Sequence, residues 1–77
     1  MGKKSSFSAE YKRFCVLLRE ARADAGLTQE DVAIRLSRPQ SYVSKYESGE
    51  RRLDVIEFLR VAKVLKVSPE TLLNKLA

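Results

Sequence analysis

Apolar residues recur along this chain at the three- and four-residue spacing of amphipathic helices. The first such stripe predicts a helix over residues 8–25, with Ser8 as its N-cap and Gly26 after its last turn. Its apolar members are Tyr11, Phe14, Leu17, Leu18 and Ala21. Cys15 borders the stripe and is expected to be a small buried or half-buried hydrophobe rather than a reactive thiol.

A short helix is predicted from Thr28 to about residue 36. The Thr28 hydroxyl can accept from the backbone amide of Asp31, and Asp31 adds negative charge to the first turn. Its inward positions are Val32, Ala33 and Leu36. Pro39 stops the run, because proline has no amide hydrogen and disfavours a helical conformation in the residue before it.

A second short helix is predicted over about residues 39–48, and Gly49 can end it in the left-handed conformation. Val43 and Tyr46 are expected to face inward, and the spacing places Tyr42 outward. Amide, hydroxyl and ammonium groups lie on the outer face, at Gln40, Ser41, Ser44 and Lys45. Such groups suit the reading of base edges in the major groove.

This pair of helices resembles the helix-turn-helix of the phage-repressor (Cro-like, XRE) family. The resemblance covers roughly residues 14–73 and rests on Gln29, Ala33, Leu36, Val43 and the run SKYESG at residues 44–49. It implies an all-α fold, a compact five-helix lambda-repressor-like DNA-binding domain with a central helix-turn-helix.

Two residues depart from the family pattern. The turn usually holds glycine where Ser37 stands, so Ser37 is expected to carry a left-handed strain of about 1 kcal/mol. A capping Ser or Thr usually stands in place of Pro39, which has no side-chain oxygen. The cap of the second helix should therefore shift to Ser37 or be lost.

The resemblance also implies roles for individual residues. Base reading falls to Gln40, Ser41, Ser44 and Lys45; Gln40 could pair with adenine, and Lys45 could donate to guanine. Phosphate contacts are expected from Thr28, Gln29, Arg38, Tyr42, Arg51 and Arg52. Arg22 matches an arginine that braces the recognition helix through a glutamate, here Glu47; the alternative is an unpaired exposed arginine.

Two further helices are predicted after the loop at residues 50–52. Asp54 caps the first, with Glu57 completing a capping box. Its inward stripe is expected to be Leu53, Ile56, Leu59, Ala62 and Leu65, flanked by Val55 and Phe58. Ser68 is expected to cap the last helix, which starts at Pro69. The last helix has three leucines, Leu72, Leu73 and Leu76. We expect some of them to pack in the core, and the others are candidates for a dimer seam.

Composition narrows the possible functions. The net charge of +5, from 15 Lys and Arg against 10 Asp and Glu, favours polyanionic partners. With no histidine and one cysteine, a zinc site, an internal disulfide and a Cys–His nucleophile are not expected, and neither is any cofactor or enzymatic activity. No apolar run reaches the ~20 residues of a membrane span. Together with this, the family resemblance implies a cytoplasmic, prokaryotic or phage-encoded, nucleoid-associated protein, and no small-molecule ligand is expected.

The chain is expected to form one helix-turn-helix DNA-binding domain over residues 8–77, preceded by a flexible N-terminal arm over residues 1–7. The expected function is that of a sequence-specific transcriptional regulator, binding a palindromic operator on double-stranded DNA as a homodimer. The alternative is a small helical interaction module, such as an antitoxin-like protein that mainly holds a protein partner. A polar outer face on the recognition helix favours the first function, and an apolar one would favour the second.

Overall fold

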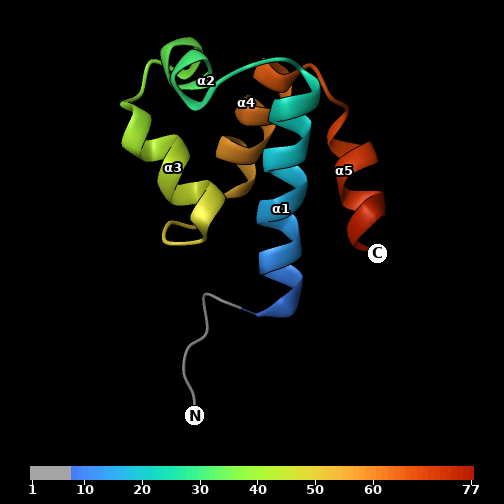
Figure 1. Ribbon diagram of the computed structural model, residues 1–77. Helices are drawn as coiled ribbons and strands as arrows, with labels where there is room; N and C mark the ends of the chain where they lie inside the picture. The colour runs from blue at the N-terminus through green and yellow to red at the C-terminus, as the bar shows by residue number, and fades with distance from the viewer. Residues whose placement is uncertain (1–7) are drawn as a thin grey trace.

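The computed structural model describes residues 8–77, and the predicted N-terminal arm lies outside the described residues. Within residues 8–77 the chain forms five helices and no strand, which confirms the predicted all-α fold. The helices are α1 (Ala9–Asp24), α2 (Gln29–Leu36), α3 (Gln40–Ser48), α4 (Val55–Leu65) and α5 (Pro69–Leu76) (Figure 1).

The helices surround a single core in which α1 and α4 are central. Helix α2 packs against α3 and α4, whereas α1 packs against α3 and α5. In Figure 1, α3 lies at the left edge and α5 at the right edge, with α1 and α4 between them. The predicted recognition helix and the last helix therefore lie on opposite sides of the domain.

Each helix contributes one apolar face to the core. The buried cluster contains Leu17, Leu18, Val32, Ala33, Tyr42, Val43, Tyr46, Phe58, Val61, Leu65 and Leu72. Phe14 and Phe58 meet edge to face with their ring centroids 5.3 Å apart, which joins α1 to α4. Cys15 is buried as expected, and burial raises the pKa of its thiol above the ordinary value.

The predicted start of α2 is confirmed in atomic detail. The Asp31 amide donates to the Thr28 hydroxyl at 3.0 Å, and the Thr28 amide donates to the Asp31 carboxylate at 2.9 Å. Asp54 and Glu57 form the same reciprocal pair at the start of α4, with bonds of 2.7 and 2.9 Å. Ser68 stands at the N-cap of α5 as expected, but within residues 8–77 its hydroxyl makes no capping hydrogen bond.

The turn between α2 and α3 follows the expectations drawn from its two unusual residues. Ser37 has φ 57° and ψ 43°, the left-handed conformation that an L-residue adopts at a cost. Pro39 is the N-cap of α3, and α3 has no side-chain cap within the described chain, so the cap is lost rather than moved to Ser37. Gly49 ends α3 with φ 89°, as predicted.

The predicted inward stripe of α4 is confirmed for Ala62 and Leu65, which are buried, and wrong for Ile56 and Leu59. Ile56 and Leu59 are 57% and 44% exposed, while Phe58 and Val61 point into the core. The predicted residues are three apart throughout, a step that falls behind the helical turn of about 3.6 residues, whereas the buried face of α4 contains Phe58, Val61, Ala62 and Leu65. In the part of the chain that the structure describes, no helix has the length and apolar content to cross a membrane.

Candidate nucleic-acid interface

The outer face of α3 carries the four side chains expected to read bases. Gln40, Ser41, Ser44 and Lys45 are all exposed, and they form two pairs four residues apart on one side of the helix. The opposite side is buried through Tyr42, Val43, Tyr46 and Glu47. The structure thus gathers the four residues on one polar surface, while their contact with bases stays a prediction.

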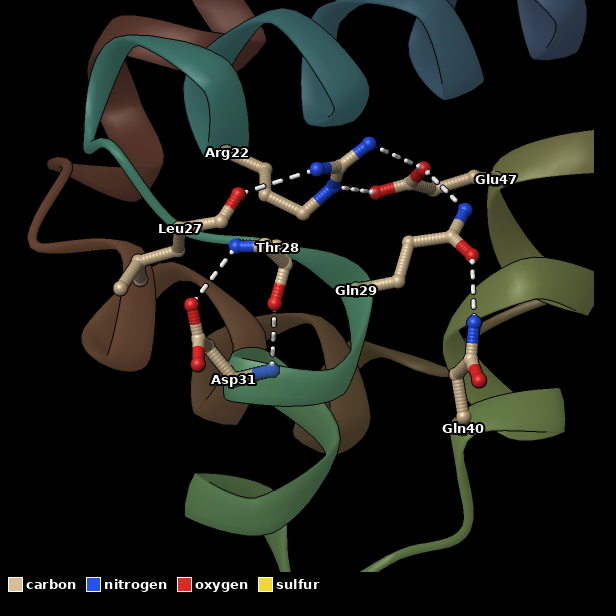
Figure 2. A network of polar contacts seen from close by, with 7 residues as sticks. All are labelled: Arg22, Leu27, Thr28, Gln29, Asp31, Gln40 and Glu47. Atoms are coloured by element: carbon tan, nitrogen blue, oxygen red, sulfur yellow. Dashed lines mark hydrogen bonds and ion pairs between the residues drawn. The ribbon is translucent and has the colours of Figure 1, made fainter.

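The expected ion pair between Arg22 and Glu47 is present (Figure 2). Arg22 Nε donates to Glu47 Oε2 at 2.7 Å, and Arg22 Nη2 donates to Glu47 Oε1 at 3.2 Å. The third nitrogen, Nη1, donates to the Leu27 carbonyl at 3.0 Å. Hydrogen bonding to Glu47 raises the pKa of Arg22 above its ordinary value. One guanidinium therefore ties α1 to the end of α3 and to the loop before α2.

Gln29 extends this network toward the outer face of α3. Its Nε2 donates to Glu47 Oε1 at 2.9 Å, and its Oε1 accepts from Gln40 Nε2 at 3.3 Å (Figure 2). Both ends of an amide expected to bind phosphate are thus engaged inside the protein. The Gln29–Gln40 contact was not foreseen, although both glutamines stand at the first position of their helices, where the two helices meet.

The expectation that Tyr42 faces outward is wrong, because its side chain is 9% exposed. Its ring packs edge to face on Tyr46, with centroids 5.7 Å apart. The guanidinium carbons of Arg38 and Arg51 lie 5.0 and 4.8 Å from the Tyr42 ring centroid, so two cations cover the ring. Burial raises the pKa of the Tyr42 phenol. Tyr42 is therefore a platform for two arginines rather than an outward side chain.

The loop after α3 holds its two arginines in different ways. Arg51 forms a bidentate pair with Glu57, with bonds of 2.8 and 3.1 Å. These bonds to Arg51, followed by the bond from the Asp54 amide, lower the pKa of Glu57 to about 2. Arg52 is exposed, and its guanidinium carbon lies 4.2 Å from the centroid of the Tyr11 ring.

The remaining expected site residues separate into surface and core. Thr28 and Arg38 are exposed near the two ends of α2. Among the candidate seam residues, Leu73 is 49% exposed and Leu76 packs partly on the core. Leu72 is 2% exposed, so its place in a dimer seam is wrong; it faces the interior, where it belongs to the core cluster.

Within residues 8–77 no group of three or more His, Cys, Asp or Glu side chains could hold a metal ion.

Comparison with known proteins places this geometry in a family. The family model described as "Helix-turn-helix domain" matches residues 13–76. The XRE-family like protein from Pseudomonas syringae pv. tomato str. DC3000 is 53% identical, with a TM-score of 0.84 over 88% of this chain and 83% of that one. None of the curated proteins matches this chain in sequence.

Two restriction-modification controller proteins share the architecture. C.AhdI from Aeromonas hydrophila is 34% identical, with a TM-score of 0.77 over 84% of this chain and 98% of that one. C.Esp1396I, solved as a tetramer in complex with its natural 35 base-pair operator, is 26% identical, with a TM-score of 0.81 over 91% of this chain and 92% of that one. The family model, which covers most of the chain, and the 53% identity to an XRE-family like protein show that this chain belongs to the XRE-type helix-turn-helix family.

Proposed function

We propose that this protein is a sequence-specific DNA-binding transcriptional regulator whose helix α3 lies in the major groove. One observation carries the proposal: α3 presents four exposed hydrogen-bonding side chains on one face and buries the other face. A helix of this width fits the major groove, where each base pair shows a distinct pattern of donors and acceptors. The similar protein C.Esp1396I was solved with its operator, which supports the same use of this fold.

The cations beside α3 suit contacts to the phosphate backbone. Arg38 and Arg52 are exposed and flank α3 in the chain, where the groove edges would lie. Thr28 stands at the start of α2, whose first amides add positive potential. Arg51 and Gln29 already have partners inside the protein, so we expect them to contribute less to phosphate binding than Arg38 and Arg52 do.

A homodimer on an approximately palindromic operator is part of the proposal. Helix α3 has nine residues and can read only a few base pairs, so two copies on half-sites about 34 Å apart would supply specificity. We place the seam on exposed apolar side chains outside α3, namely Leu73 on α5 with Val55, Ile56 and Leu59 on α4. In sedimentation analysis, Leu73→Asp and Ile56→Asp should each favour the monomer, whereas dimers that persist in both variants would contradict this seam.

The exposed apolar residues of α4 also favour a second candidate, an antitoxin-like module that mainly holds a protein partner. Val55 is 71% exposed and Ile56 is 57% exposed, and adjacent exposed apolar side chains suit contact with a protein partner. The outer face of α3 is polar rather than apolar, so the DNA-binding function is favoured over the antitoxin-like one.

Fluorescence anisotropy tests the proposed function directly. The natural protein is titrated with DNA from upstream of its own gene and with scrambled DNA, at several salt concentrations. The variant Gln40→Ala/Lys45→Ala is compared with Asn74→Ala/Lys75→Ala, which also loses one amide and one positive charge but from the exposed surface of α5.

We expect preferential binding to the upstream DNA and an affinity that falls steeply with salt. The variant on α3 should lose mainly the preference, and the variant on α5 should retain it. Equal binding of both DNAs by every protein, or no binding at all, would overturn the assignment of α3 to the groove.

A further inference from the structure

One side of α4 is open to solvent within the described chain. A helical turn of about 3.6 residues collects the exposed side chains opposite the buried face, which contains Phe58 and Leu65. The exposed side chains are Val55, Ile56, Leu59, Arg60, Lys63 and, directly after the last turn, Lys66. We call these six residues the α4 surface.

The α4 surface is apolar at its start and positively charged at its end. Val55, Ile56 and Leu59 are 71%, 57% and 44% exposed, so a group of large apolar side chains meets the solvent. The three cations follow over the second half of the helix and its C-cap. Protein interfaces commonly have both parts, an apolar centre and a polar rim.

The cations of the α4 surface have no carboxylate of their own. Neither of the two ion pairs within residues 8–77 includes one of them. The one acidic residue of α4, Glu57, is held by Arg51 at 2.8 Å. Positive charge therefore lies beside the apolar group without a negative counterpart, and a binding partner can supply one.

Three kinds of partner differ in what they offer to this surface. A DNA backbone offers phosphates to the cations but leaves the apolar side chains against a polar, charged surface. The α4 surface of a second copy covers the apolar side chains but adds three further cations. An acidic amphipathic segment of another protein offers apolar side chains and carboxylates together, so it matches both parts.

We propose that the α4 surface binds an acidic amphipathic segment of a partner protein, which competes there with the second copy of this chain. The inference rests on the proposed function, since Val55, Ile56 and Leu59 also belong to the proposed dimer seam. A partner that binds only the monomer lowers the concentration of dimer by mass action. Operator binding then falls, so the partner antagonises the regulator without touching α3.

A synthetic peptide can stand for the unidentified partner. The probe is a peptide of about 18 residues, long enough to form a helix in water, with leucines at three- and four-residue spacing and glutamates beside them. Its control has glutamine in place of every glutamate. Fluorescence anisotropy gives the affinity of each labelled peptide for the full chain, and the NMR shifts of the backbone amides show where each peptide binds.

Two triple variants separate the charges of the α4 surface from positive charge in general. The α4 variant loses the three cations and keeps the apolar side chains: Arg60→Gln/Lys63→Gln/Lys66→Gln. The control variant loses one arginine and two lysines from exposed positions on α1 and α5: Lys12→Gln/Arg19→Gln/Lys75→Gln. Circular dichroism confirms that each variant is folded.

We expect the natural protein to bind the glutamate peptide about tenfold more tightly than the glutamine peptide, with amide shifts centred on α4. The α4 variant should lose this difference but still dimerise, because its apolar side chains remain, and the control variant should keep the difference. In the natural protein the glutamate peptide should shift sedimentation from dimer to monomer and lower the affinity for upstream DNA. Neither effect should occur in the α4 variant.

Equal affinities of the natural protein for the two peptides would overturn the inference, as would amide shifts on α3 instead of α4. A loss of DNA affinity in the α4 variant with unchanged peptide binding would assign the cations to nucleic acid. Peptide binding that leaves the dimer intact would overturn the competition. A natural protein that sediments as a monomer without peptide would instead contradict the proposed seam, and the peptide affinities would still decide what the α4 surface binds.

Discussion

Two arginine–glutamate pairs of nearly equal length occupy very different places in this domain. Arg22 and Glu47 are 25 residues apart in sequence and join α1 to α3 at 2.7 Å. Arg51 and Glu57 are six residues apart and join a loop to the first turn of α4 at 2.8 Å. The side chains of the first pair are 17% and 4% exposed, against 39% and 16% in the second.

Burial rather than distance decides what each pair does. When a buried charge loses its partner it has no water to replace it, so the pair is costly to break. An exposed pair is screened by solvent, and its arginine can exchange a carboxylate for another anion at little cost. Arg22 is thus committed to holding α3, while Arg51 can leave Glu57 at a smaller cost in free energy.

Removal of Arg22 should have the largest effect. Arg22→Met keeps most of the side-chain volume but leaves the Glu47 carboxylate buried with only Gln29 as a partner. We expect the free energy of unfolding to fall by about 3–5 kcal/mol, measured by urea denaturation. The variant Arg22→Met/Glu47→Met removes both charges and should recover part of that loss. A loss below about 1 kcal/mol in Arg22→Met would show that Glu47 is effectively hydrated.

The same substitution at the second pair should cost much less. Arg51→Met removes the bond to Glu57 and the contact with the Tyr42 ring, for which we expect about 1 kcal/mol of lost stability by the same measurement. Arg60→Met, at an exposed position on α4, controls for the loss of one surface charge. An effect as large as that of Arg22→Met would remove the distinction between the pairs.

Acidification should weaken the second pair within a defined pH range. The bonds from Arg51, followed by the bond from the Asp54 amide, lower the pKa of Glu57 from 4.5 to about 2, so the folded protein binds this proton more weakly than the unfolded chain does. The stabilisation is complete above pH 4.5 and disappears as the pH falls toward 2. The difference in stability between the natural protein and Arg51→Met should therefore narrow over this range, and a constant difference would contradict the pairing.

An NMR titration of the Glu57 carboxyl isolates the same effect from that of other acidic groups. In Arg51→Met its pKa should rise, because the largest cause of its low value is gone. The bond from the Asp54 amide remains, so the pKa should stay below its ordinary value. An unchanged pKa in the variant would show that the helix cap alone holds the carboxylate ionised.

Features that depend on local chemistry were predictable from the sequence. The reciprocal cap of Thr28 and Asp31, the left-handed Ser37 and the end of α3 at Gly49 each follow from a few neighbouring residues. The pairing of Arg22 with Glu47 joins distant parts of the chain, and it was predictable only because the resemblance supplied both partners.

Features that depend on how helices meet were not predictable. Tyr42 was placed outward by its spacing, but Arg38 and Arg51 approach it from two separate loops and cover it. In α4 a strict three-residue spacing predicts Ala62 and Leu65 correctly but places Ile56 and Leu59 inward, because a step of three drifts around a helix of about 3.6 residues per turn. The contact of Gln29 with Gln40 required the crossing of α2 and α3, which sequence spacing alone does not provide.

Salt should have the smallest effect and should separate the two pairs most cleanly. The screening length of dissolved salt is about 10 Å at 0.1 M and about 3 Å at 1 M, and screening acts mainly on charges that water surrounds. The coupling energy of each pair is measured with a double-mutant cycle at both concentrations, which cancels the general effect of salt on stability. We expect the coupling of Arg51 with Glu57 to fall by a few tenths of a kcal/mol, and that of Arg22 with Glu47 to stay constant. An equal fall in both would mean that water reaches the Arg22–Glu47 pair, and burial would then no longer distinguish the two pairs.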